Sequence, residues 1–166
     1  MSLSQHGRLR GFSGITALPE FNVAVFALLL NYPWEFLQTP LFAEMRSASH
    51  WEAVKTCTRA TAGDAVIMLA AFWTVAAFAG TRQWIAATPT VGRLVLFVSV
   101  GTLITTVIEW LVQKGWWIDS WRYSELMPVL PGIGVGVSPV LQWVLIPPLT
   151  AWFVRRQLSG LAQLAR

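Results

Sequence analysis

The sequence predicts an all-α integral membrane protein, a compact four-helix transmembrane bundle with a tryptophan-rich interfacial loop or short helix between the third and fourth spans. Charged residues make up only 12% of its 166 residues, against roughly 25% in a soluble globular protein, and the mean hydropathy is +0.54. Four stretches are apolar over the ~20 residues that a membrane-spanning helix needs. Tryptophans of the kind found at headgroup level flank those stretches, at Trp51, Trp84, Trp116, Trp117 and Trp121. We therefore treat residues 1–166 as a single membrane domain.

The first predicted span covers about residues 21–42 and follows a basic N-terminal segment, residues 1–20, that we place in the cytoplasm. An apolar core behind a basic region also suits a signal peptide. The residues that follow the core, from Asn31 to Glu35, are bulky and offer no small-x-small cleavage site. We therefore expect an uncleaved span, kinked at Pro33.

The other spans are predicted at about residues 61–78, 91–112 and 133–154, with short connections that favour antiparallel neighbours. The fourth span cannot begin as a regular helix, because residues 128–139 carry three prolines and three alternating glycines. These glycines either permit close helix packing or line a ligand. A nucleotide-binding loop is excluded, because no strand precedes them.

Basic residues predict the orientation and argue against a nucleic-acid partner. The net charge is +4, but no run of basic residues is longer than Arg155–Arg156. With four spans, seven basic residues lie on the side of both termini and five on the other. This bias predicts cytoplasmic termini, in a bacterial inner membrane. The expected partners are the lipid bilayer, a lipophilic small molecule, and either a membrane protein or a second copy of the chain.

Three ionisable residues, Glu35, Asp64 and Glu109, lie inside predicted spans, where charge is costly and marks a functional site. We predict that all three are catalytic and that they meet in one polar pocket in the outer half of the bundle. Polar residues accompany each of them at helical spacing. The residues expected to bind the ligand are Asn31, Trp34, Gln38, Trp110, Gln142 and Trp143.

Two of these acids could instead have a purely structural role. Asp64 is predicted within the first turn or so of its helix, where a carboxylate favours the N-terminus and could simply cap it. Glu109, near the outer end of its span, could be merely interfacial. Glu35 lies ~20 Å into a span that begins at Phe21, which makes a capping or interfacial role hard to sustain.

The residue inventory restricts the chemistry. The single cysteine, Cys57, excludes an internal disulfide, and both histidines, His6 and His50, lie outside the apolar segments. We therefore predict no metal ligands among these types and no cofactor. A hard cation such as Mg²⁺ or Na⁺ stays open, because carboxylate and amide oxygens would suit it.

The predicted function is binding or transformation of a lipophilic small molecule. A carboxyl in a low-dielectric pocket can stay protonated and donate a proton, and Trp34, Trp110 and Trp143 could stabilise a cation. This combination suits an acid–base isomerase or cyclase of an isoprenoid-like substrate. The Trp34-Glu35 pair resembles small membrane terpene cyclases, and no residue role is transferred on a match of two residues. The alternatives are a non-catalytic accessory subunit of a larger membrane complex and a small oligomeric carrier or ion pathway.

Overall fold

The computed structural model describes residues 14–116 and 121–164, and every regular element in those ranges is helical. Short 3-10 helices, η1 (Thr39–Leu41), η2 (Ala43–Arg46) and η3 (Arg82–Ile85), lie in the connections. The long helices are α2 (Pro19–Gln38), α3 (His50–Ala79), α4 (Val91–Gln113) and α5 (Val137–Leu164).

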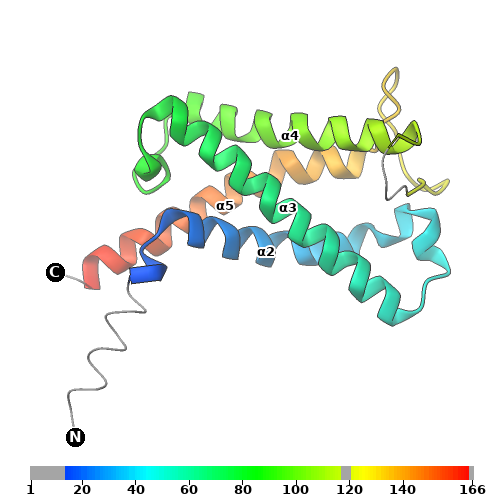
Figure 1. Cartoon of the computed structure of the whole chain (residues 1–166), viewed down its shortest axis with the longest axis horizontal. Helices are drawn as coiled ribbons and strands as arrows, with labels where there is room; N and C mark the ends of the chain where they lie inside the picture. Colours follow the sequence, from blue (N-terminus) through cyan, green and yellow to red (C-terminus); the bar gives the residue numbers. More distant parts are fainter. Residues whose placement is uncertain (1–13, 117–120, 165–166) are drawn as a thin grey trace, which may run out of the picture.

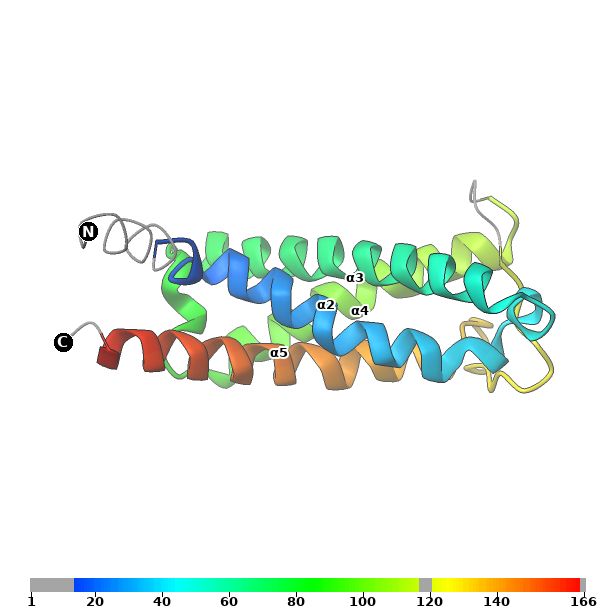
Figure 2. The same ribbon diagram turned by 90° about the horizontal axis from the view of Figure 1, so that it is seen from below.

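These long helices lie side by side along the length of the molecule (Figures 1 and 2). Helix α2 packs against α3 and α5, and α4 packs against the same two helices, so each helix has two main neighbours. The start of α2, the α3–α4 connection and the end of α5 lie at one end (Figure 1). The opposite end carries η1, η2 and the connecting residues 121–136. We call it the loop end.

Three of the helices, α3, α4 and α5, are long and apolar enough to cross a membrane. Helix α2 is not among them, although it has 20 residues. Buried polar residues interrupt its apolar sequence and lower its hydropathy: Asn22, Asn31, Glu35 and Gln38. The structure thus supports three of the four expected spans by length and composition.

The first two helices differ from their predicted bounds. Helix α2 ends at Gln38 rather than near residue 42, because Pro40 has no backbone N–H to continue the α-helical hydrogen bonds, and the chain continues as a 3-10 turn. Helix α3 begins at His50 rather than near residue 61. Ser49 and Glu52 form a capping box there, each side chain bonding the other residue's backbone N–H.

Helix α4 has nearly the predicted bounds, whereas α5 is shifted towards the C-terminus. Residues 128–136 form a turn in which Gly132 and Gly134 have φ of 88° and 70°, a region that disfavours other residues. Helix α5 therefore begins at Val137 rather than near residue 133, and it continues through Pro147 and Pro148. Residues 121–136 contain no helix, so the described part of this connection is a loop.

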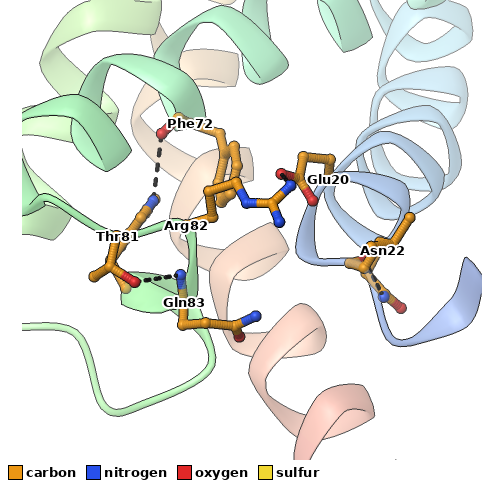
Figure 3. A network of polar contacts seen from close by, with 8 residues as sticks. Glu20, Asn22, Phe72, Thr81, Arg82 and Gln83 are labelled. Atoms are coloured by element: carbon orange, nitrogen blue, oxygen red, sulfur yellow. Dashed lines mark hydrogen bonds and ion pairs between the residues drawn. The ribbon is translucent and has the colours of Figure 1, made fainter. Parts of the chain in front are cut away.

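The apolar core fills the end of the molecule away from the loop end. Trp84 of η3 inserts between Phe72 and Phe97, with ring centroids 5.7 and 5.4 Å away, and its indole N–H donates to the Phe72 carbonyl at 3.3 Å. Figure 3 shows polar contacts at this end of the molecule, among them the pair of Arg82 and Glu20, whose guanidinium and carboxylate lie 3.1 Å apart. Of the buried polar residues of α2, only Asn22 lies at this end, where it bonds the backbone of Thr16 and Leu18, and the others lie at the middle and the loop end.

Candidate functional site

A stripe of polar side chains on α2 faces the interior of the molecule. Asn31, Glu35 and Gln38 are all buried, with Glu35 only 8% exposed. Their spacing of four and three residues places them on one helix face. Gln38 Nε2 donates to Glu35 Oε1 at 2.8 Å, and Ser138 of α5 donates to Gln38 Oε1 at 2.9 Å. The stripe is therefore bonded to a second helix.

Gln142 of α5 joins three helices through one amide nitrogen. Its Nε2 lies 2.8 Å from Asn31 Oδ1, 3.1 Å from Glu35 Oε1 and 2.9 Å from Asp64 Oδ2. Two carboxyl groups on α2 and α3 are thus held within hydrogen-bonding distance of the same atom. We call Asn31, Glu35, Gln38, Asp64 and Gln142 the polar cluster.

Asp64 lies in the middle of α3, because this helix begins at His50. The expectation that Asp64 stands in the first turn is therefore wrong, and so is the capping role that depended on it. The cap is Ser49, which lies outside the predicted span. In the middle of an apolar helix a carboxyl group needs polar partners, and Gln142 supplies one.

Glu109 of α4 has partners of its own from the loop. Tyr123 donates its hydroxyl proton to Glu109 Oε2 at 2.5 Å, and the Trp121 indole N–H donates to the same oxygen at 3.2 Å. The Tyr123 oxygen also accepts the backbone N–H of Gly136 at 2.9 Å. Burial and the neighbouring Glu109 carboxyl raise the pKa of Tyr123, so its hydroxyl remains a donor.

Two connections meet above these residues and form a clasp, made by residues 40–46 and 121–125. Glu44 accepts the side chain of Arg122 at 3.0 Å and its backbone N–H at 3.1 Å, and Arg46 pairs with Glu125 at 2.7 Å. Backbone bonds from Ala43 to Arg122 and from Ser124 to Leu41 add to the clasp. Partial burial opposes ionisation of Glu44, but the bonds from Arg122 outweigh it and lower the pKa of Glu44.

A cleft of about 830 Å³ lies between the helices beneath this clasp. This is within the usual range of ~300–1,000 Å³ for a small-molecule site. Glu35, Asp64 and Glu109 all contribute to its walls. Its other lining residues are Gln38, Thr39, Phe42, Glu44, Met45, Thr56, Cys57, Arg59, Ala60, Gly63, Ile67, Thr105, Ile108, Trp121, Pro139 and Gln142. The three acids expected to share one pocket therefore line one cleft.

The expected aromatic residues lie elsewhere. Trp110 is 37% exposed and packs edge-on against Trp116, with ring centroids 5.6 Å apart. Trp143 is 1% exposed and covers Gly101, where an added methyl group would meet the indole ring at 2.2 Å. Trp34 packs against the apolar core and does not line the cleft. Asn31 is also away from the cleft surface and reaches it through Gln142.

Two residues that contact Glu109, Trp121 and Tyr123, were not expected to belong to the site. The signal for them was the mixture of aromatic and charged residues between the third and fourth spans, which predicted an interfacial segment or lid. Trp116 lies exposed outside the cleft, and Trp117, the other tryptophan expected there, lies outside the described residues. Within the described residues, no group of three or more His, Cys, Asp or Glu is arranged to hold a metal ion.

Comparisons with known proteins do not assign the chain to a family. No protein family model matches the chain, and neither a curated protein nor a solved structure matches it. The geometry of the cleft is therefore the basis for assigning a function.

Proposed function

We propose that the chain is an integral membrane protein in which α2 joins α3, α4 and α5 as a fourth transmembrane helix. The distribution of polarity supports this. Large apolar side chains such as Leu37, Phe78 and Leu103 are exposed on the outer surface, whereas the polar stripe of α2 is buried. Such an arrangement is costly in water and favourable in lipid, where backbone and side-chain polar groups must be satisfied internally.

We further propose that the cleft binds or transforms a lipophilic small molecule by acid–base chemistry. The observation that carries this proposal is the single amide nitrogen of Gln142 bridging Glu35 and Asp64 on the cleft wall. Buried carboxyl groups this close share a proton more readily than they both ionise. The pair can therefore hold one proton for transfer while the second carboxyl accepts one.

An isomerisation illustrates the chemistry. One carboxyl of the pair transfers its proton to a carbon of a substrate double bond, which leaves a carbocation at the neighbouring carbon. A carboxylate on the cleft wall removes a proton from an adjacent carbon, and the double bond re-forms at a new position. One proton is given and one is taken, so the substrate is isomerised without an external reactant.

Substitution of Glu35 by glutamine tests this function. Glutamine keeps the shape and most hydrogen bonds but cannot donate an acidic proton. Native mass spectrometry of the gently solubilised full chain should first reveal a co-purified lipophile of defined mass. Conversion of that lipophile by Glu35→Gln should fall by about 10²–10⁴-fold, the usual contribution of general acid–base catalysis. Protein level and helix content should be unchanged.

The matched control is Glu52→Gln, which neutralises an exposed carboxyl group in the first turn of α3, outside the cleft, where glutamine can also form the capping box. Undiminished conversion by correctly inserted Glu35→Gln would contradict the acid–base role. A stoichiometric membrane protein in the spectrum, with no lipophile, would favour an accessory subunit instead. Dependence of conversion on added Mg²⁺ would assign the carboxyl groups to a cation rather than to a proton.

A further inference from the structure

Gly63 lies on the cleft wall of α3, directly before Asp64, and has open space where a side chain would be. A methyl group added there would meet no atom within 4 Å. Glycine in a membrane helix commonly allows a neighbouring side chain or helix to approach closely, as Gly101 does beneath Trp143. Gly63 has no such neighbour. Its missing side chain therefore widens the cleft rather than tightening the helix packing.

Arg59 lies one helical turn before Gly63 on the same wall. It is the one basic residue among the described lining residues, it is exposed, and it makes no hydrogen bond or ion pair with any described residue. Glu44, an acidic residue of the clasp that also lines the cleft, is already paired with Arg122. Arg59 thus presents to the cleft a positive charge that has no partner among the described residues.

We propose that the cleft takes an amphiphile with an anionic headgroup, such as a phosphate or a carboxylate on an apolar chain. This inference rests on the proposed function, because it places that ligand in the same cleft. The headgroup pairs with Arg59, and the chain lies over Gly63 towards the polar cluster. The guanidinium suits this pairing, because its forked N–H groups match the oxygens of phosphate and carboxylate.

The spacing of Arg59 and Asp64 along α3 sets the distance between the headgroup of the ligand and its reacting group. Arg59 and Asp64 are five residues apart, which is about 7.5 Å along the helix axis. Long side chains on a helix generally lean towards its N-terminus, which for Arg59 is the direction away from Asp64 and lengthens the separation. The group acted on by the carboxyl pair therefore lies roughly 10 Å from the headgroup. An arginine at a membrane surface also pairs with bulk phospholipid, but filling the space at Gly63 would not block such pairing.

Binding of two matched probes tests the inference. Dodecyl phosphate and dodecanol share one chain and differ in the headgroup, and both are titrated, below micelle-forming concentration, onto the full chain in phosphatidylcholine nanodiscs. Dodecyl phosphate should bind the unaltered protein at least ~10-fold more tightly, the effect of one charge-assisted pair. Arg59→Gln should abolish that advantage. Gly63→Leu should weaken both probes, because its side chain occupies the cleft.

Lys55→Gln is the control, because Lys55 is a cation one turn before Arg59 that does not line the cleft. It should leave both affinities unchanged. Gly63→Ala is a smaller filling of the same space and should give an intermediate loss, and circular dichroism verifies that both Gly63 variants keep their helix content. Inorganic phosphate should not compete at the concentrations that saturate dodecyl phosphate.

Several outcomes would overturn the inference. Equal affinity for the two probes, no binding of dodecyl phosphate, or undiminished binding of it by Arg59→Gln would each exclude an anionic headgroup at Arg59. Full binding of dodecyl phosphate by Gly63→Leu would place the pairing at the membrane surface, and effective competition by inorganic phosphate would indicate a free anion as the ligand. If the inference fails but dodecanol binds and Gly63→Leu abolishes that binding, the cleft remains supported as a site for a lipophile, as the proposed function requires.

Discussion

Gln142 Nε2 has two hydrogen atoms but lies within hydrogen-bonding distance of three oxygens, on Asn31, Glu35 and Asp64. One oxygen is therefore always without a hydrogen from this amide. A proton on Glu35 or Asp64 would supply the missing donor and remove a buried negative charge at the same time. The unequal numbers of donors and acceptors thus favour a site that holds one proton.

Removing this amide should destabilise the protein. Gln142→Leu keeps a side chain of similar size but leaves three buried oxygens without their shared donor. We expect a loss of about 1–3 kcal/mol in unfolding free energy, the cost of unsatisfied buried polar groups. Denaturant titration of the protein in detergent micelles, followed by circular dichroism, measures it. Leu141→Ala, a truncation on the exposed face of the same helix, is the control. Wild-type stability of Gln142→Leu would show that the cluster does not contribute to folding.

Single residues differ in how well their sequence context predicts their place. Periodicity places Asn31, Glu35 and Gln38 on one helix face, and that face is buried. The positions of the tryptophans are harder to predict from the sequence, because an aromatic residue beside a polar helix face can point to lipid, to the core or to the cleft. Trp143 packs against α4 at Gly101, where the absence of a side chain leaves room for the indole ring. No local pattern in either helix reveals this contact.

At the scale of elements, the clasp closes the loop end over the cleft. It joins residues far apart in the chain through ion pairs, backbone bonds and the contact between the rings of Phe42 and Tyr123, whose centroids are 6.0 Å apart. Tyr123 connects this clasp to α4 through Glu109 and to the glycine-containing turn through Gly136. Opening the clasp would therefore disturb one wall of the cleft directly.

Protonation of Glu44 should loosen the clasp. The folded-state pKa of Glu44 lies below its ordinary value of 4.5, so its stabilising effect is complete above that value and is lost as the pH falls through the lowered one. Hydrogen exchange of the Ala43 and Ser124 amides, expressed as protection factors, should show less protection at about pH 3 than at pH 7. Glu44→Gln should show weak protection at both values. Equal protection of the unaltered protein across this range would contradict the prediction.

The bounds of α3 show where hydropathy alone fails. The polar residues 50–60 were excluded from the predicted span because they do not suit lipid, yet they continue the same helix. The pair Ser49 and Glu52 is a recognisable capping signal in the sequence, and it identifies the true start of the helix. Hydropathy locates the part of a helix suited to the membrane, whereas capping residues locate its end.

At the scale of the whole molecule, the two ends of the bundle differ in how they are packed. Aromatic packing around Trp84 fills the end near the α3–α4 connection, and the cleft occupies the end beneath the clasp. The short connection at η3 can pack tightly because it buries Trp84 and Ile85. The longer α4–α5 connection at the loop end instead supplies the polar groups that satisfy Glu109 and contributes Trp121 to the cleft wall.

This arrangement predicts the orientation of the protein in the membrane. If α2 spans the bilayer with the other three helices, the end carrying Arg82, Arg93 and Arg155 should face the cytoplasm, because basic residues are retained there. Reporter fusions at Arg166 and at Ser47, directly after the clasp, should then report opposite compartments, with Arg166 cytoplasmic. A third fusion at Ala87 should agree with the one at Arg166. If Arg166 and Ser47 report the same side while Ala87 reports the other, α3 spans and only one of α4 and α5 does. A reporter at the N-terminus tests α2 itself, because it should report the side of Arg166 if α2 spans and the side of Ser47 if α2 does not cross.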